Sequence, residues 1–399
     1  MEEIRLKEIC NLENGYAFKS SDYVDYSNTL NCRMSNIRPD GSFNILYNAK
    51  YLPDSFIEKY KDYLLKDGDL IIAMTDMAGD PKILGVPTVV DTQGYNLLLN
   101  QRVGKLILFS NSFNVDYLKL ALQSRKVRNY FKQFAGGGVQ LNVGKKDILN
   151  APIIVRQEKE QLYIATIFKT ITELEHRNTE QLLLLDELIK SRFVEMFGDP
   201  ILNSKNWNII TLKELTSKIG SGATPRGGRD SYKTEGISLI RSMNVHNNRF
   251  EYKDLAHISN EQADKLNNVI VQENDILLNI TGASVARCCI VPSNVLPARV
   301  NQHVCIIRCA IDIIPTFISY LLTNEIFQKH LLDLAGSGAT REAITKQQVE
   351  QLLIILPPLS LQNQFADFVA QVDIQRLKVK KSLEKLETLK KSLMQEYFG

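Results

Sequence analysis

Short apolar runs separated by glycine, proline and asparagine recur in two regions of the chain. "DLIIAMT" (69–75) and "VGKLILF" (103–109) lie in the first region, and "DILLNIT" (275–281) and "HVCIIRC" (303–309) lie in the second. Runs of this length that are rich in branched residues predict β-strands. In both regions the pattern then predicts an amphipathic helix, over 115–134 and 315–334, followed by a glycine loop, a short capped turn and an apolar strand. Each region is therefore predicted to be a globular α+β unit.

A long stretch with apolar residues three or four positions apart follows each unit, and this spacing is typical of a coiled-coil helix. Prolines lie just before both stretches, and Gly198 and Gly399 are predicted to occupy the C′ position after each helix. Such helices could join domains, mediate dimerisation or hold two units a fixed distance apart. The predicted seam residues are Ile164, Ile167, Ile171, Leu174, Leu185 and Leu188 in the first stretch, and Phe365, Phe368, Val372, Val379, Leu386, Leu389 and Leu393 in the second.

The second half of the chain repeats the first. "SRFVEMFG" (191–198) and "SLMQEYFG" (392–399) align without gaps at an offset of 201, and "NQRV" (100–103) aligns with "NQHV" (301–304) at the same offset. Elsewhere the offset drifts by a few residues, which indicates that loops differ in length while the elements persist. The predicted boundaries are 1–155 for the first globular unit, 156–198 for the first long helix, 199–356 for the second unit and 357–399 for the second helix.

The composition limits the class of protein. A chain of 399 residues is too long for one hydrophobic core and suits two or three domains. Its 44% hydrophobic and 23% charged residues are ordinary for a soluble protein, and a net charge of +3 permits a nucleic-acid partner without indicating one. No apolar run approaches the ~18 residues of a membrane span and the start lacks a secretory signal, so we expect a cytoplasmic protein with no membrane partner.

Motifs of common catalytic sites are missing from the sequence. It contains no G-x4-G-K-[ST] phosphate loop, no G-x-S-x-G, no H-E-x-x-H, and no N-P-P-[YF] tetrapeptide of the kind that cradles the base in amino-methyltransferases. The six cysteines include no C-x2-C pair, so we predict reduced, buried thiols rather than a metal site. A duplicated chain without catalytic motifs is predicted to be a binding module with two equivalent sites, without a cofactor or metal of its own.

Four polar clusters occur in both halves and are the candidate binding residues. The first is the turn "NGYAFKSSDY" (14–23), which matches "SGATPRGGRDSY" (221–232), and the second is "RMSNI" (33–37), which matches "RSMNV" (241–245). Glycine loops with cations suit phosphates, while arginine and asparagine pair with guanine and adenine edges. The alternatives are a solvated turn and an arginine that satisfies a carbonyl. The candidates are Lys19, Ser20, Thr224, Arg226, Arg229 and Tyr232 in the first cluster, and Arg33, Asn36, Arg38, Arg241 and Asn244 in the second.

The third and fourth clusters follow later strands. "NQR" (100–102) matches "NQH" (301–303), where asparagine could equally be a turn former, and "AGGGVQLNVGKK" (135–146) matches "AGSGATREAITK" (335–346), which could be a flexible connection. Glutamine suits adenine or phosphate, and a glycine loop with cations permits close approach to a sugar-phosphate chain. The candidates are Gln101, Arg102, Gln302 and His303 in the third cluster, and Gln140, Lys145, Lys146, Thr340, Arg341 and Lys346 in the fourth.

The whole layout resembles the specificity subunit of type I restriction–modification systems. The resemblance rests on "GSGATPR" (220–226), "DILLNIT" (275–281), "NQHV" (301–304), "GSGATREAI" (336–344) and "ILPPLSLQNQFADFV" (355–369). It implies two target-recognition domains joined by two long antiparallel coiled-coil helices with pseudo-twofold symmetry. The first half departs from the pattern, since "APIIVRQEKEQL" (151–162) lacks the double proline and "NGYAFKS" lacks the Thr-Pro.

The same resemblance implies a function. Each recognition domain would read one half of a bipartite site in double-stranded DNA, and the helices would set the unread spacer. Such subunits have no catalysis of their own. They dock two methyltransferase (modification) subunits, which bind S-adenosylmethionine and methylate adenine, and through them the restriction subunits that use ATP and Mg²⁺. Two alternatives remain open: a specificity subunit of another DNA-modification system for phage defence, and a coiled-coil scaffold that binds no DNA, which the nearly neutral charge favours.

Overall fold

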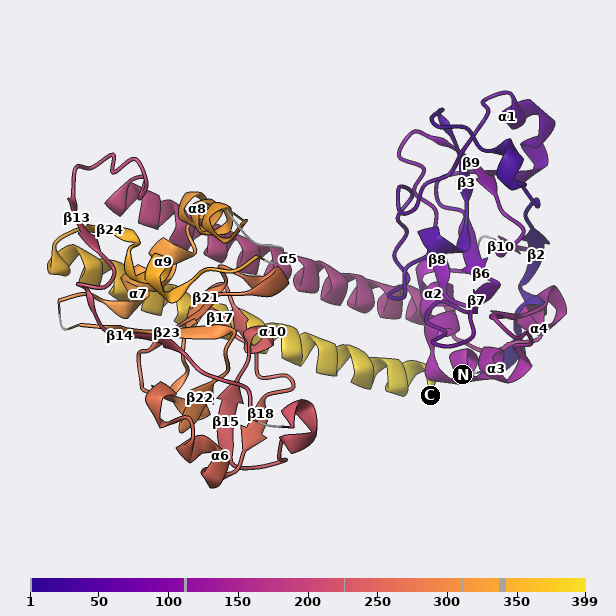
Figure 1. The fold of residues 1–399 in the computed structure, drawn as a ribbon. Helices are drawn as coiled ribbons and strands as arrows, with labels where there is room; N and C mark the ends of the chain where they lie inside the picture. The colour runs from indigo at the N-terminus through magenta and orange to yellow at the C-terminus, as the bar shows by residue number, and fades with distance from the viewer. Residues whose placement is uncertain (1, 111–112, 226, 311, 337–341) are drawn as a thin grey trace. The chain divides into compact units, whose positions relative to one another are not determined.

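The computed structural model describes residues 2–110, 113–225, 227–310, 312–336 and 342–399. These residues form two compact units (Figure 1). Unit 1 comprises Met1–Asn178 and Lys381–Gly399, and unit 2 comprises Thr179–Lys380. Each unit combines mixed strands and helices with parts of two long helices, which agrees with the predicted α+β class.

Unit 1 contains two four-stranded sheets and two strand pairs. The main sheet has the order β2-β10-β6-β8 and is antiparallel, while the second sheet, β4-β3-β9-β5, contains one parallel pair, β3 with β9. The strands are β1 (Glu2–Arg5), β2 (Cys10–Asn14), β3 (Thr29–Cys32), β4 (Tyr51–Leu52), β5 (Leu64–Leu65), β6 (Leu70–Ala73), β7 (Thr75–Met77), β8 (Pro87–Val89), β9 (Asn96–Leu99), β10 (Val103–Leu108), β11 (Gln140–Asn142) and β12 (Pro152–Val155); β1 pairs with β12 and β7 with β11.

Unit 2 repeats this topology. Its sheets have the orders β14-β23-β20-β21 and β18-β15-β22-β19, and β15 and β22 are again parallel. The strands are β13 (Asn208–Thr211), β14 (Thr216–Ser221), β15 (Ile237–Ile240), β16 (Val245–His246), β17 (Arg249–Phe250), β18 (Ala256–Ile258), β19 (Ile270–Val271), β20 (Ile276–Asn279), β21 (Cys288–Ile290), β22 (Ala298–Val300), β23 (Val304–Cys309) and β24 (Leu353–Leu356); β13 pairs with β24 and β16 with β17.

The continuous apolar runs are explained by burial on both faces of the central strand. In β6, Leu70 and Ile72 enter one hydrophobic core, while Ile71 and Ala73 enter the other. Successive side chains of a strand point to opposite faces, so a strand covered on both sides needs an unbroken apolar run. β20 is built in the same way. Together with their 3-10 turns, the units also contain the short helices α1 (Phe56–Lys59), α4 (Lys145–Leu149), α6 (Asn260–Asp264) and α9 (Lys346–Glu350).

The single amphipathic helix predicted in each unit is two helices. Residues 115–134 form α2 (Val115–Gln123) and α3 (Arg125–Phe134), and the second unit contains α7 (Pro315–Leu322) and α8 (Glu325–Gly336). Ser124 leaves the helical conformation with a ψ of 151° and caps the second helix, since its side chain accepts from Val127 N. Hydroxyl side chains favour this capping position over a helix interior.

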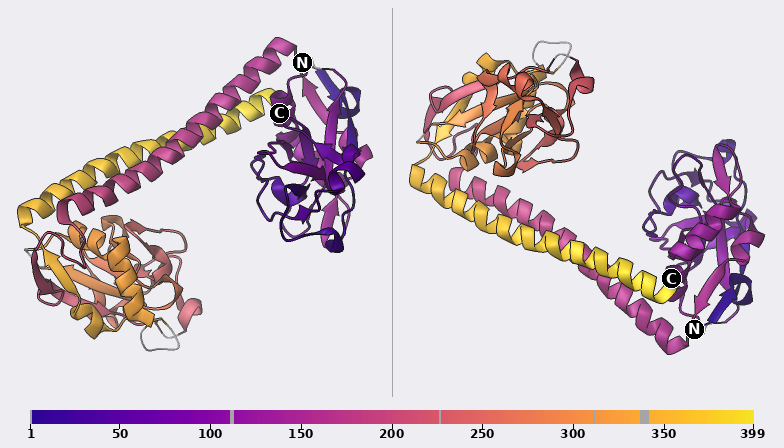
Figure 2. Two further views of the ribbon diagram at one scale, coloured as in Figure 1. Left: turned by 90° about the horizontal axis from the view of Figure 1, so that it is seen from above. Right: turned by 90° about the horizontal axis from the view of Figure 1, so that it is seen from below.

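The two long helices are α5 (Glu158–Phe197) and α10 (Leu359–Phe398), of 40 residues each. They run side by side and antiparallel (Figure 2): Asn178 Nδ2 donates to Ser382 Oγ at 3.1 Å in unit 1, and Arg376 pairs with Asp186 at 2.5 Å in unit 2. As predicted, Gly198 and Gly399 end them with positive φ angles of 79° and 86°. Within the described part of the chain, no helix has the length and hydropathy needed to cross a membrane.

The seam between these helices differs from the predicted one. Leu174, Leu188 and Leu389 were predicted in the seam but are 40%, 48% and 46% exposed. Glu175 occupies the seam position instead, and its carboxylate forms an ion pair with Lys390, whose Nζ lies 2.7 Å from Glu175 Oε2. The predicted and observed seams of α5 share Ile164, Ile171 and Leu185, and between these positions the seam follows the phase that includes polar residues.

All six cysteines are free, and five of them are buried. Burial raises the pKa of Cys10, Cys289, Cys305 and Cys309 to about 12. Thiols with such pKa values are poor nucleophiles and poor metal ligands at neutral pH. Among the described residues no group of three or more His, Cys, Asp and Glu side chains could hold a metal ion.

Candidate nucleic-acid interface

The parallel strand pair of each unit brings the second and third polar clusters together. β3 and β9 end at the paired residues Cys32 and Leu99, so the loops that start at 33 and 100 leave the same edge of the sheet. Asn100 N donates to Cys32 O at 3.0 Å across this edge. In unit 2, Asn301 N donates to Ile240 O at 3.1 Å in the same way. Adjacent loops after parallel strands commonly form binding sites.

A glycine seats the first cluster on the same edge. A Cβ on Gly15 would lie 2.2 Å from Leu99 O, and one on Gly222 would lie 1.8 Å from Val300 O, so neither position accepts a side chain without a shift of the loop. Next to Gly15, Tyr16 O accepts from Gln101 N at 3.0 Å. In unit 2, Gly222 N donates to Asn301 O at 3.1 Å. We call residues 14–23, 33–38 and 100–102 the loop end of unit 1, and 221–225, 241–246 and 301–303 the loop end of unit 2.

The strand after the glycine loop lies next to this end. Met74 N donates to Arg102 O at 3.0 Å, and Val143 N donates to Met74 O at 2.9 Å. The same two bonds occur in unit 2, from Ile280 N to His303 O and from Ile344 N to Ile280 O. The fourth cluster is therefore joined to the third through one central strand in each unit.

Asparagine organises the third cluster. Asn100 Oδ1 accepts from Arg102 N at 3.1 Å, and Asn301 Oδ1 accepts from His303 N at 3.0 Å. The side chains that follow in these turns point to solvent: Gln101, Arg102 and Gln302 are all exposed. The turn-forming role of asparagine and the candidate binding role of the next two residues therefore coexist in both units.

Asn36 and Asn244, which were predicted to contact DNA, are buried and bound to the backbone in this structure, which favours a structural role for both. Asn36 is 3% exposed; its Nδ2 donates to Asn44 O and Ile45 O, and its Oδ1 accepts from Arg33 N. Asn244 is 0% exposed and makes the equivalent bonds in unit 2. Both amides thus satisfy buried backbone groups that would otherwise lack partners, and neither is accessible to a duplex.

The arginines beside these asparagines are half-buried and held by aromatic rings. Arg38 Cζ lies 3.8 Å from the centre of the Tyr47 ring. Arg241 lies 5.3 Å from the Tyr232 ring and donates to Asp254 O. A stacked guanidinium keeps unused N–H donors in a fixed plane, which suits bidentate contacts to phosphate or guanine.

A chain of side-chain hydrogen bonds crosses the loop end of unit 2. The Thr224 hydroxyl donates to Gln302 Oε1, so Gln302 Nε2 faces His303 Nε2 at 3.0 Å. An amide nitrogen only donates, so His303 Nε2 accepts and His303 Nδ1 carries the proton. Nδ1 lies 2.5 Å from Thr281 Oγ1, which accepts this proton in a hydrogen bond. The first and third clusters of unit 2 are linked by these bonds.

The remaining candidates lie in different places. Lys19 and Ser20 are exposed on the first loop, and Gln140 is half-buried in β11. Lys145 and Lys146 lie on α4, which packs against the 3-10 turn Leu6–Glu8 and β2, and Lys346 on α9 faces Glu350 at 3.5 Å. No described hydrogen bond brings these three lysines to the loop ends. Arg226, Thr340, Arg341 and the Arg229 side chain are outside the described residues.

One group of residues at the loop end of unit 1 was not among the candidates. Tyr16 and Phe18 of the first loop contact Phe56 and Tyr60, with ring centroids 4.4 to 6.3 Å apart. The spacing of the aromatic residues in "FIEKYKDY" (56–63) was a signal that could have revealed them.

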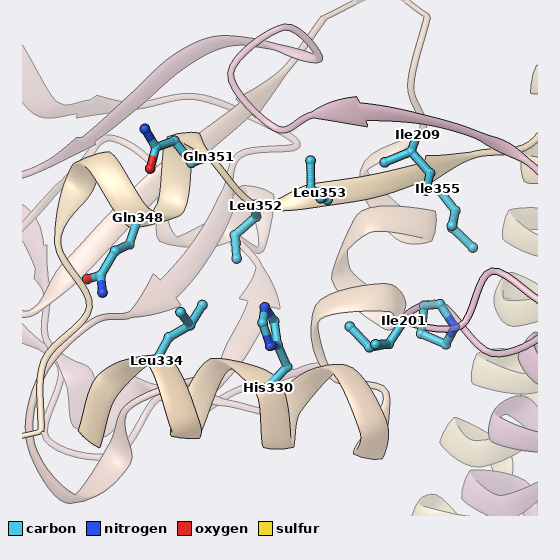
Figure 3. A pocket seen from close by; sticks show the side chains of 10 residues that line it. Ile201, Ile209, His330, Leu334, Gln348, Gln351, Leu352, Leu353 and Ile355 are labelled. Carbon is cyan, nitrogen blue, oxygen red and sulfur yellow. The ribbon is translucent and has the colours of Figure 1, made fainter. Parts of the chain in front are cut away.

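One hollow among the described residues of unit 2 lies away from its loop end. It has a volume of about 370 Å³ and is mainly apolar, with His330 of α8 among leucine and isoleucine side chains (Figure 3). No Lys, Arg, Asp or Glu side chain lines it, so it offers no charge to a phosphate or a metal ion. Its lining residues are Pro200, Ile201, Ile209, His330, Leu334, Gln348, Gln351, Leu352, Leu353 and Ile355.

Comparisons with known proteins point in one direction. The family model of the type I restriction modification DNA specificity domain matches residues 1–184 and 204–389. The MjaVIII specificity subunit of a type I restriction enzyme from Methanocaldococcus jannaschii is 25% identical over 52% of this chain, and the matched region covers 47% of that protein. The EcoBI specificity subunit from Escherichia coli is 22% identical over 99% of this chain and 85% of its own length. The crystal structure of the type I S subunit from M. genitalium superposes with a TM-score of 0.59 at 13% identity and covers 100% of this chain and 96% of that one.

Proposed function

Because the chain belongs to the family of type I restriction–modification DNA specificity domains, we propose that it is the specificity subunit of such a complex and that each unit reads one half of a bipartite DNA site. One observation carries this proposal. Clusters far apart in the sequence meet at the ends of a parallel strand pair, and this happens in both units through equivalent backbone bonds.

The chemistry of the loop ends suits a duplex. Lys19 and Arg102 offer exposed cations for phosphates, which supply most of the affinity of DNA-binding proteins. Gln101, Gln302 and the stacked arginines offer the amide and guanidinium donors that pair with base edges. Loops, rather than one inserted helix, would thus carry the specificity of each unit.

The long helices would set the spacer between the two half-sites. Both α5 and α10 run from one unit into the other, and 40 residues correspond to about 60 Å at the rise of an α-helix. Leu183, Leu184 and Leu188 of α5 and Ile374 and Leu377 of α10 are exposed near the Asp186–Arg376 pair. Exposed apolar side chains of this size on a helix pair suit an interaction with another protein, and we assign them to contacts with the methyltransferase subunits.

The chain itself would be non-catalytic. In this proposal, two methyltransferase subunits bind S-adenosylmethionine and methylate adenine, and the restriction subunits use ATP and Mg²⁺. The methylated base must leave the stack to reach a methyltransferase site, so the specificity subunit needs only to bind and position the duplex.

The proposal is tested by expressing the full chain with its modification subunits and mapping methylated adenines by sequencing. A bipartite motif with a constant unread spacer is expected. Binding of the purified complex to that motif should weaken steeply as salt rises, because counterions are released when phosphates are neutralised. The absence of a sequence-specific methylation motif, with all subunits assembled, would favour the scaffold alternative.

The role of the helices has its own test. Insertion of seven residues at the same level of α5 and α10 adds about 10 Å, or about three base pairs of duplex. The motif should then keep both half-sequences and gain a longer spacer. A change in either half-sequence with an unchanged spacer would contradict the spacing role.

A further inference from the structure

Four aromatic rings form a surface cluster at the loop end of unit 1. They belong to Tyr16, Phe18, Phe56 and Tyr60, which we call the aromatic cluster; the Tyr16 and Tyr60 centroids are 4.4 Å apart, and those of Phe18 and Tyr60 are 5.2 Å apart. None of the four belongs to a buried core of the unit, and Tyr16 is 37% exposed. Large rings gathered on the surface outside a core indicate an interaction site.

The cluster is held in place before any ligand binds. Gly15 fixes the loop on Leu99 O, and Tyr16 N donates to the same carbonyl at 2.8 Å. The Lys59 ammonium lies 5.3 Å from the Phe56 ring centre and 5.0 Å from that of Tyr60. Hydrogen bonds from Tyr16 and Lys59 also lower the pKa of the Tyr60 hydroxyl. Rings ordered in advance lose little conformational entropy on binding.

The duplication shows that the fold itself does not need these rings. Gly222 is the counterpart of Gly15, so Ala223 stands where unit 1 has Tyr16, and Pro225 where it has Phe18. Leu266 of unit 2 corresponds to Tyr60 and is 7% exposed in a hydrophobic core. Unit 2 thus builds the same loop with aliphatic residues, so the surface aromatics of unit 1 serve something other than folding.

We propose that the aromatic cluster is an apolar subsite that contacts thymine methyl groups in the half-site read by unit 1. The inference rests on the proposed function and names one chemical group within its DNA target. Ring faces cannot read hydrogen-bonding edges, and the apolar group on a base edge is the thymine 5-methyl group.

The surroundings of the cluster favour DNA as the occupant. Gln101, a candidate reader of bases, is joined to Tyr16 through the bond from Gln101 N to Tyr16 O. Lys19 is exposed on the same loop, and Lys59 lies on the rings, so cations for phosphates flank an apolar surface. The rings pack on one another as a broad surface, whereas side chains that insert between base steps are single protruding wedges.

The test uses the full chain in complex with its modification subunits and the motif found by methylation mapping. Each thymine of one half-site is replaced by uracil, which removes only the methyl group. For the half-site read by unit 1, at least one uracil should weaken binding about 3- to 10-fold, as expected for one buried methyl group.

Two variants make the test specific. Tyr16→Ala reproduces the residue of unit 2 at a loop position that accepts it, and should bind uracil and thymine duplexes equally. Tyr16→Phe keeps the ring, and should retain the thymine preference of the wild type. Substitutions in the half-site read by unit 2 should affect the three proteins alike.

Several results would overturn the inference. These are a half-site for unit 1 without thymine, a wild-type protein indifferent to uracil throughout that half-site, and a thymine preference that survives Tyr16→Ala. An increase in 2-aminopurine fluorescence at the contacted step, lost in Tyr16→Ala, would show ring insertion instead of methyl contact. Failure of the proposed function is distinguishable, because the wild-type complex would then show no sequence-specific binding at all.

Discussion

Substitution of Asn244 separates a structural role from a base-reading role. In unit 2 its Nδ2 donates to Glu251 O at 2.9 Å and to Lys253 O at 3.4 Å, and its Oδ1 accepts from Arg241 N at 3.1 Å. Asn244→Ala removes one good donor bond, one weak one and one acceptor bond, and leaves partly buried backbone groups without these partners. With about 1 kcal/mol per good bond and a part of the about 1–3 kcal/mol that an unsatisfied buried group costs, we expect a loss of about 2–4 kcal/mol of stability.

Asn244→Asp should be at least as damaging, although it preserves the shape of the side chain. The carboxylate keeps the acceptor for Arg241 N but places a negative oxygen opposite two carbonyl oxygens at a site with 0% exposure. A buried carboxylate oxygen that faces carbonyl oxygens instead of a donor costs more than a missing amide. Asn247→Ala is the matched control, because Asn247 is exposed and its side chain pairs, among the described residues, with the Gln328 side chain; its effect should stay within about 0.5 kcal/mol.

Peptide-resolved hydrogen exchange of the full chain is the suitable measurement, because a chain with two units does not unfold in one step. Faster exchange is expected in residues 237–258, which contain β15 to β18, and it should be absent in the control. Binding of the complex to the half-site read by unit 2 should weaken in parallel with the loss of protection from hydrogen exchange. If Asn244→Ala kept full protection and relaxed the preference for one base, the structural reading would be refuted.

Three further outcomes are expected. Gly222→Ala should displace the first loop of unit 2 by more than about 1 Å from Val300 O and weaken recognition of one half-site at least 10-fold, while the other half-sequence in methylation mapping stays unchanged. Arg376→Leu should change the free energy of unfolding of the helix pair by less than about 1 kcal/mol, since partly exposed ion pairs contribute little; a large loss of stability would mean that this ion pair specifies how the helices pack. At pH 8 the native protein should react slowly with Ellman's reagent and the denatured protein with all six thiols, because burial raises the pKa of Cys10, Cys289, Cys305 and Cys309 to about 12; rapid labelling of native protein would contradict the burial.

The sequence predicted the existence of the helices and strands well, and it predicted breaks within helices and the packing of the helix seam less well. Long helices with a 3–4 apolar spacing, ended by glycine at 198 and 399, could be read directly, because periodicity and capping are local properties. The break at Ser124 is also local, yet the apolar face continues across it, so periodicity alone runs α2 into α3. The phase of the seam near Leu174 and Glu175 depends on the partner helix, which periodicity cannot supply.

For the candidate site, the sequence revealed the clusters, but only the fold revealed how they meet and which of their residues are exposed. The four clusters were found by their repetition, and the parallel strands β3 and β9 that join them became visible only in the fold. Sequence reasoning gave the exposed Gln101 and the buried Asn36 the same role, since both are polar residues next to a strand. Burial decides between them, and burial is a property of the assembled unit.

Residues that are repeated in both units therefore indicate a role in folding more than a role in DNA recognition. Residues that recur in both units, such as Gly15 and Gly222 or Asn36 and Asn244, contact backbone groups that both copies of the fold must satisfy. Two units that read different half-sites must share that framework and differ in the side chains that meet the bases. The informative positions are then equivalent places with different exposed residues, as in Tyr16 against Ala223, and the aromatic cluster follows from this contrast.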